Sequence, residues 1–208
     1  MILVLDNEVR PDYRYLAPEI TRLLPDAKRH VFVDDPTVQS LKGVDGVVLG
    51  GSTASVYDSE HEAWVDAQCD LVHRCLEESI PILGICFGHQ LANVALGGTV
   101  EADERRATFV ECTHDDCGVL EGVFPPVPAL HADRVTELGT GLSAVGKTTY
   151  DEHFCTVHDE KPLWTVQFHP EFTERVRDNP SDWDDGAFTF ADSNAPRVLD
   201  NFAEYCGY

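Results

Sequence analysis

The sequence predicts an α/β fold built on a mostly parallel, doubly wound sheet with helices on both faces and a β-rich C-terminal half. Two observations lead to this prediction. Short apolar runs alternate with amphipathic helical patterns up to residue 98, and after it the segments become shorter and strand-like between Gly, Pro and Asp. A chain of 208 residues with 43% hydrophobic content can build one sizeable core, so we expect a single domain over residues 1–208.

The first half of the chain predicts four strands and three helices in alternation. Apolar runs predict strands at residues 2–6, 28–34, 44–49 and 81–85, and amphipathic spacing predicts helices at residues 13–24, 60–79 and 87–96. This βαβ series favours a flavodoxin-like sheet, whose ligands lie outside the carboxyl ends of the strands. The glycine turn "GGSTAS" and Cys86 both fall at that edge.

The second half predicts short strands and an acidic tail. Strand-like segments lie at residues 107–113, 134–138, 142–150, 153–159 and 163–169, and they either extend the same sheet or fold beside it. Residues 175–195 are irregular and acidic, and residues 196–206 predict a last short helix. Three roles stay open for this tail: it covers the site, binds a partner or keeps the protein soluble.

The charge of the chain restricts its partners. It carries 37 acidic and 15 basic residues, for a formal net charge of -22. Such a balance repels nucleic acid and anionic membranes, so we expect neither as a partner. No stretch has the length of a membrane span and "MILVLD" lacks the cationic region of a leader, which predicts a cytoplasmic protein. The dispersed acidic surface resembles that of halophilic proteins.

The seven cysteines indicate reduced thiols, because they form an odd set without paired spacing. The closest approach to a metal pattern is Cys112 to Cys117 with His114 between them. Structural zinc sites bring two ligand pairs and only one is visible, so we expect no metal site and interpret this segment as a polar loop.

Cys86 has the setting of a nucleophile. The pentapeptide "GICFG" places it between Gly84 and Gly88 where a strand meets a helix, which is the sequence pattern of a nucleophile elbow with sulfur in place of oxygen. The helix that begins at Phe87 brings its positive end beside the sulfur and favours the thiolate. The alternative is a buried packing cysteine, which by itself is the commoner use of this residue.

A base with its own orienting acid follows far along the chain. The segment "TVQFHPEF" ends an apolar strand with His169 and places Glu171 two residues later, with a proline between them that restricts the backbone. An imidazole oriented by a carboxylate is what a cysteine nucleophile needs.

Taken together, "GGSTAS", "GICFGHQLANVALGG", "LHADRV" and "VQFHPEF" resemble the class I, triad-type glutamine amidotransferases over essentially the whole chain. The pattern looks closest to the glutaminase part of GMP synthase and to its free-standing relatives. The resemblance implies that Cys86 is the nucleophile, His169 the general base and acid, and Glu171 the orienting carboxylate. It implies hydrolysis of L-glutamine to glutamate and ammonia through a γ-glutamyl thioester.

The resemblance also implies the supporting residues. The backbone N–H groups of Gly51 and Phe87 are the expected oxyanion hole, and Gln90 is the expected substrate-binding residue. His131 and Asp133 match a pair near the family's site and are interpreted as support, whereas His89 is interpreted as structural. Ser52 stands where the family usually has a proline, so we expect a more mobile loop there.

The resemblance implies no cofactor but a partner. No P-loop or pyrophosphatase motif occurs in these residues, so amidation would need a separate ATP-dependent synthetase subunit of the ATP pyrophosphatase type, which activates xanthosine monophosphate. Two alternatives remain: a γ-glutamyl or other amide hydrolase on the same scaffold, and a non-catalytic regulatory relative.

Overall fold

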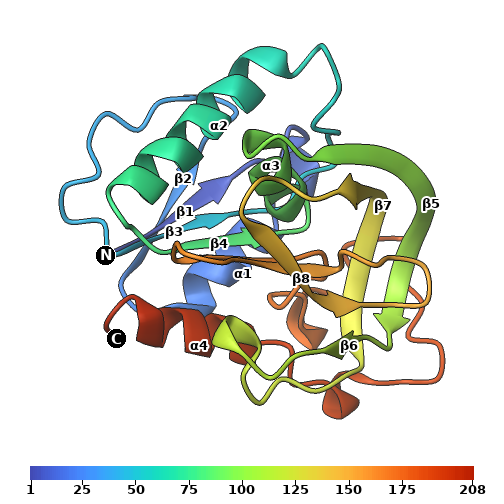
Figure 1. The fold of residues 1–208 in the computed structure, drawn as a ribbon. Coiled ribbons are helices and arrows are strands. Elements are labelled where there is room, and N and C mark those ends of the chain that lie inside the picture. The colour runs from blue at the N-terminus through green and yellow to red at the C-terminus, as the bar shows by residue number, and fades with distance from the viewer.

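The computed structural model describes residues 1–208 and is built around an eight-stranded sheet in the order β2-β1-β3-β4-β10-β9-β8-β6 (Figure 1). Five strands pair in parallel, namely β2 (Ala27–Val31), β1 (Ile2–Asp6), β3 (Gly46–Leu49), β4 (Ile82–Ile85) and β10 (Leu163–Val166). Three strands extend the sheet in antiparallel pairing, namely β9 (Cys155–His158), β8 (Leu142–Lys147) and β6 (Thr113–His114). The parallel part has the predicted doubly wound order.

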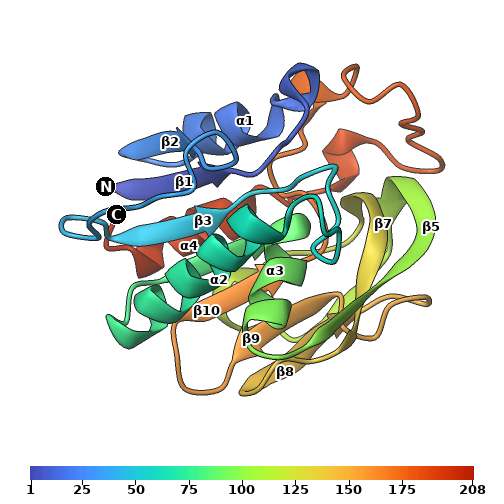
Figure 2. The same ribbon diagram turned by 90° about the horizontal axis from the view of Figure 1, so that it is seen from above.

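Helices cover both faces of the sheet, as predicted (Figures 1 and 2). One face carries α1 (Leu16–Leu23) and α4 (Arg197–Tyr205), and the other carries α2 (Glu62–Glu77) and α3 (Phe87–Ala95). Side chains alternate along each strand, so Val48 joins the first core while its neighbour Val47 joins the second. The two cores therefore share the strands that carry the predicted site at their ends.

The strands β5 (Thr99–Val110) and β7 (Val127–Glu137) form a separate antiparallel ribbon beside the sheet. The sequence left open whether the strands of the second half extend the main sheet or fold beside it. Both occur, since β8, β9 and β10 extend the main sheet whereas β5 and β7 lie beside it. Both ribbon strands begin earlier than predicted, because the polar run "EADERR" hides the start of β5 and "VPALHAD" gives no clean alternation.

Element ends differ from the predictions by a few residues. The helix predicted from residue 13 begins at Leu16, because Pro11 starts a separate 3-10 helix over Pro11–Tyr13. The strand predicted to residue 34 ends at Val31. Short 3-10 helices also occur at Gly118–Leu120, Glu174–Val176 and Phe190–Asp192, and the last two are the helical turns at the start and near the end of the acidic tail.

The tail over residues 175–195 lies on the ribbon. Trp183 contacts Phe109 of β5 and Phe172, with ring centroids 5.1 and 4.5 Å apart. The Asp184 N–H donates to the carbonyl oxygen of Ala107 at 3.0 Å. Aromatic packing thus fixes an otherwise irregular segment against β5.

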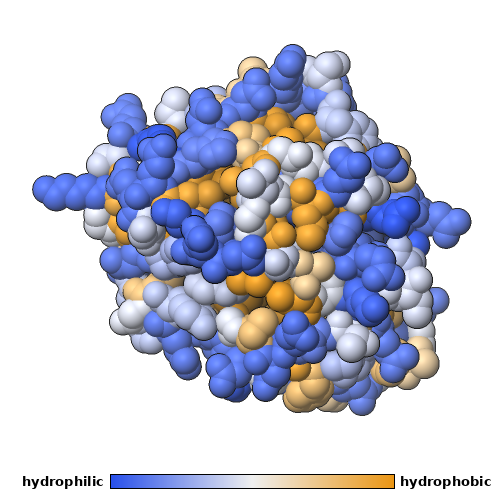
Figure 3. Space-filling view, viewed as in Figure 1, coloured by the Kyte–Doolittle hydropathy of each residue, from blue (hydrophilic) through white to orange (hydrophobic).

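Hydrophilic side chains dominate the face shown in Figure 3, with apolar ones visible between them. None of the helices combines the length and the apolar character that a bilayer span requires. The segment considered for zinc is divided between two environments, because Cys112 is buried in the core whereas the Nδ1 of His114 contacts the carbonyl oxygen of Asp115 at 3.0 Å.

Candidate active site

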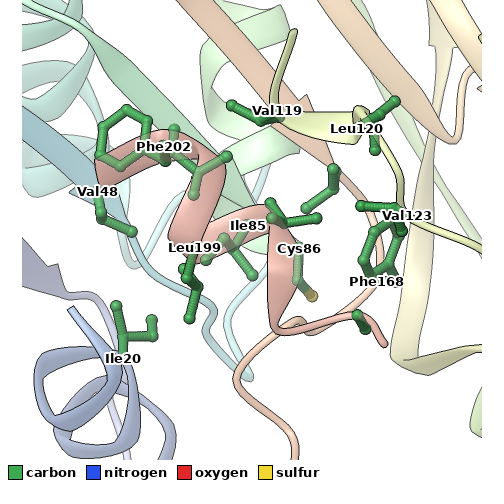
Figure 4. Close-up of a cluster of buried hydrophobic side chains, with 14 of the residues drawn as sticks. Ile20, Val48, Ile85, Cys86, Val119, Leu120, Val123, Phe168, Leu199 and Phe202 are labelled. Atoms are coloured by element: carbon green, nitrogen blue, oxygen red, sulfur yellow. The ribbon is translucent and has the colours of Figure 1, made fainter. Parts of the chain in front are cut away.

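Cys86 occupies a sharp turn between β4 and α3. Its backbone has φ +53° and ψ -106°, which is a costly conformation for a residue with a side chain. Gly84 and Gly88 make the turn possible. A Cβ on Gly84 would lie 2.6 Å from the carbonyl oxygen of Gly88, and one on Gly88 would collide with the backbone of Leu49. The sulfur is buried beside Ile85 at the edge of the core that α4 covers (Figure 4).

His169 follows β10 and is paired with Glu171. Its Nδ1–H donates to the Oε1 of Glu171 at 2.8 Å, and both side chains are buried. Burial by itself lowers the pKa of His169, but the Glu171 carboxylate and the Cys86 sulfur raise it above its ordinary value of 6.5. The site therefore favours the imidazolium form of His169.

Gly51 and Phe87 both lie next to Cys86. Gly51 follows the end of β3, and a Cβ on it would lie 2.9 Å from the Cε1 of His169 and 3.8 Å from the Cβ of Cys86. Its N–H donates to no backbone carbonyl. Phe87 is the first residue of α3, where an N–H has no acceptor within the helix. The N–H groups predicted as oxyanion donors are thus not used by the backbone.

The loop that follows Gly51 is hydrogen-bonded to Glu8 at its base. The Oε2 of Glu8 accepts from the Thr53 N–H at 2.8 Å, and the Oε1 accepts from the Thr53 hydroxyl at 2.6 Å. The Ser52 hydroxyl accepts from the Ala54 N–H at 3.0 Å. These bonds oppose the mobility expected from Ser52.

Asp133 of β7 holds the same loop further out. Its carboxylate accepts from the Ser55 hydroxyl at 2.6 Å and from the Tyr57 hydroxyl at 2.9 Å. Its backbone carbonyl accepts from the Gln90 side chain at 3.1 Å and faces the Nδ1 of His131 at 3.1 Å. Asp133 therefore joins the loop after Gly51, α3 and the ribbon.

His131 lines the same cavity as Cys86 and has a neutral ring. Burial lowers the pKa of His131 to about 4. Its Nε2 is 3.2 Å from the hydroxyl of Tyr150, on which the ring stacks. With Nδ1–H donated to Asp133, Nε2 is left as an acceptor for that hydroxyl, so His131 is occupied on both sides.

His89 lies behind the site, as its helical position indicates. Its Nδ1 is 2.6 Å from the Thr165 hydroxyl, and burial lowers the pKa of His89 to about 3. It does not line the cavity, and neither do the remaining histidines, which are His30, His61, His73, His114, His153 and His158.

A cavity of about 460 Å³ opens over Cys86 and is lined by Cys86, Gln90, His131 and His169, among other residues. Three further lining residues were missed in the sequence: Glu8, Arg105 and Asp182. The signal for Glu8 was its position just past the carboxyl end of the first strand. Arg105 and Asp182 carry no local signal, because they meet only when the tail folds onto β5.

Comparisons with known proteins identify the family of the chain. The family model "Glutamine amidotransferase class-I" matches residues 25–180. The GMP synthase [glutamine-hydrolyzing] of Nitrobacter hamburgensis is 36% identical over 133 residues, which are 60% of this chain and 23% of that protein. The same enzyme of Neisseria gonorrhoeae is 28% identical over 170 residues, or 74% of this chain and 31% of that protein. The chain spans less than a third of these relatives.

Solved structures share the fold. A protein from Thermoplasma acidophilum, described as one of the subunits of a GMP synthase, aligns with a TM-score of 0.74 and 21% identity, over 99% of this chain and 93% of that one. A glutamine amidotransferase from Thermotoga maritima gives a TM-score of 0.71 and 19% identity, over 98% and 93%. Because the family model covers most of the sequence and the α/β fold agrees with it, the chain belongs to the class-I glutamine amidotransferase family.

Proposed function

We propose that this chain hydrolyses L-glutamine to glutamate and ammonia through a γ-glutamyl thioester on Cys86. One observation carries the proposal: a cysteine at a strained strand-to-helix turn lines the same cavity as His169, whose Nδ1 is held by the buried carboxylate of Glu171. In this proposal residues 1–208 form one amidotransferase domain, and the reaction needs no cofactor. It needs a reduced Cys86, which fits a reducing compartment.

The first half of the proposed reaction makes the thioester. The Cys86 thiolate attacks the side-chain amide carbon of glutamine, and the His169 imidazolium gives its proton to the departing ammonia. The negative oxygen formed on the way accepts from the Gly51 and Phe87 N–H groups. Losing one such donor typically raises the barrier by roughly 3 kcal/mol. Gln90, one helical turn beyond Cys86, contacts the substrate.

The second half releases glutamate. The His169 ring, now neutral, takes a proton from water at Nε2, because Glu171 holds the other ring nitrogen as a donor. The water oxygen attacks the thioester carbon, and the Cys86 thiolate leaves. His131 does not replace His169 as the base, because burial holds the pKa of His131 near 4 and its Nε2 faces Tyr150.

We propose that the ammonia passes to a separate ATP-dependent synthetase subunit of the ATP pyrophosphatase type, with xanthosine monophosphate as the acceptor. The support is that the matched relatives are named GMP synthase [glutamine-hydrolyzing], and that the Thermoplasma acidophilum neighbour, whose fold this chain shares over 93% of that protein, is described as a subunit of such an enzyme.

The test is release of glutamate and ammonia from L-glutamine by the purified protein in molar KCl. The Cys86→Ala variant removes the nucleophile, and Cys69→Ala is the matched control, because Cys69 is a partly buried thiol on α2 outside the cavity. We expect release by the wild type and by Cys69→Ala but not by Cys86→Ala.

The assay is repeated with a candidate pyrophosphatase subunit, xanthosine monophosphate and ATP. Stimulation supports a GMP synthase partnership, and Cys86-dependent release without stimulation points to another acceptor. Loss of glutamine turnover in both settings overturns the glutaminase proposal. Turnover of γ-glutamyl amides would then favour the amide hydrolase. No turnover of either substrate would favour the non-catalytic regulatory relative.

A further inference from the structure

Two other carboxylates that line the cavity hold the loop after Gly51. Glu8 accepts from Thr53 and from the Arg10 N–H, and Asp133 accepts from Ser55 and Tyr57. Neither of them is paired with a cationic side chain, in contrast to Asp182.

Arg105 of β5 and Asp182 of the tail form an ion pair in the wall of the same cavity. The Arg105 Nε lies 3.0 Å from the Asp182 Oδ2, and Nη2 lies 3.3 Å from Oδ1. The two side chains are 46% and 49% exposed. A guanidinium has five N–H donors and a carboxylate about four acceptor positions, so each partner keeps binding capacity toward the cavity.

The pair is fixed in place from both sides. Arg105 belongs to β5, and the residues that follow Asp182 bind the same strand through Trp183 and the Asp184 N–H. The Arg105 guanidinium holds the pKa of Asp182 below its ordinary value, so the carboxylate stays charged. Arg10 also lines the cavity, but its guanidinium lies over the Tyr13 ring at 4.2 Å.

The geometry points to Arg105 and Asp182 as the site that recognises the zwitterionic head of the substrate, an inference that rests on the proposed glutaminase activity. Arg105 binds the α-carboxylate and Asp182 binds the α-ammonium. When the amide carbon lies at Cys86, the α-carbon is three bonds away, so the head group lies beside Cys86 in the cavity that Arg105 and Asp182 also line. In a chain with net charge -22, an α-carboxylate is repelled unless a cation stands beside it.

The pair makes the enzyme specific for free amino acids with a terminal amide. Two analogues of glutamine separate its halves. The compound 4-aminobutanamide lacks the α-carboxylate, and 4-carbamoylbutanoic acid lacks the α-ammonium. Each is compared with L-glutamine by its KM for ammonia release, or by its Ki against L-glutamine.

For Arg105→Gln we expect KM to rise about tenfold for L-glutamine and for 4-carbamoylbutanoic acid, since a charged hydrogen bond is lost, with no change for 4-aminobutanamide. For Asp182→Asn we expect a similar rise for L-glutamine and for 4-aminobutanamide, with no change for 4-carbamoylbutanoic acid. In both variants kcat for L-glutamine stays near the wild-type value, because the reacting atoms are untouched.

Arg177→Gln is the matched control. It breaks the Arg177–Asp185 pair, at 3.0 Å, in the same tail but outside the cavity. If Arg105→Gln weakens all three compounds alike, or if Arg177→Gln has the same effect, the pair only holds the tail and the inference is wrong.

The two proposals fail in different ways. Wild-type protein that releases no ammonia from L-glutamine overturns the glutaminase activity. Calorimetric binding of L-glutamine and the two analogues to the Cys86→Ala protein, with and without Arg105→Gln, then tests the recognition site by itself. Equal binding of L-glutamine and 4-aminobutanamide to the Arg105-containing protein overturns it.

Discussion

The close approach of β4 and α3 predicts that adding one methyl group at Gly84 slows the reaction. The new Cβ would lie 2.6 Å from the carbonyl oxygen of Gly88 and 2.8 Å from its carbon, and real Cβ contacts essentially never fall below 3.0 Å. The first turn of α3 must therefore move by at least about 0.4 Å, the difference between 2.6 and 3.0 Å, and by about 0.8 Å to reach ordinary contact at 3.4 Å.

That movement displaces the atoms that the reaction uses. In the proposed reaction Phe87 supplies an oxyanion donor and Gln90 a substrate contact, and both lie on α3. Because a misplacement of 1 Å can cost about a hundredfold in rate, we expect Gly84→Ala to lower kcat about tenfold. Overpacking of this kind also costs about 1–3 kcal/mol of unfolding free energy. Gly88→Ala, whose Cβ comes closer to a backbone oxygen, should lose more of both.

The assay is kcat for glutamate release, measured with the unfolding free energy from urea titration. Gly97→Ala is the control, because no atom lies within 4 Å of its new Cβ, although its φ of +87° makes alanine costly by about 1–2 kcal/mol. This control should lose stability but keep kcat. If Gly84→Ala keeps the wild-type kcat, or if Gly97→Ala loses as much kcat, the argument from the helix position is refuted.

Three further predictions follow from the site. Glu171→Gln removes the carboxylate that raises the pKa of His169, so that pKa should fall and kcat should drop by about 10³–10⁴; an unchanged pH profile of kcat would contradict this role. Asp133→Asn replaces the acceptor of two hydroxyl groups with an amide, so kcat should fall several-fold. Tyr57→Phe removes only one of these hydroxyl groups, so its kcat should fall less. Equal losses of kcat would argue against a role of Asp133 in positioning the loop after Gly51. Burial lowers the folded-state pKa of His131 to about 4 and of His89 to about 3, so the folded protein binds fewer protons than the unfolded chain. The unfolding free energy should therefore decrease as pH falls from about 6.5 toward 4, with proton uptake on unfolding measured by calorimetry in buffers of different ionisation heat. At pH 8 this uptake should give way to proton release, because the raised pKa of His169 keeps its ring charged in the folded protein.

The sequence by itself determined the parts of the molecule whose signals are local. Apolar runs and helical spacing placed the parallel strands, α2, α3 and α4 within a few residues, because burial on a two-sided sheet imposes those patterns. The turn at Cys86 was predictable, since Gly84 and Gly88 lie two residues before and two residues after it, and a side chain at either position would collide where the helix comes close to the strands. His169 and Glu171 are two residues apart, so their pairing was also visible.

Only the tertiary structure decided the contacts between segments that are far apart in the chain. Asp133 meets Ser55 and Tyr57 across more than seventy residues, and Arg105 meets Asp182 across 77. These residues are polar and lie in the ribbon, in the tail or in the loop after β3, where no hydrophobic periodicity predicts their partners. Their positions follow instead from aromatic packing of the tail on β5 and from the pairing of β5 with β7, which bring the walls of the cavity together after the sheet has formed.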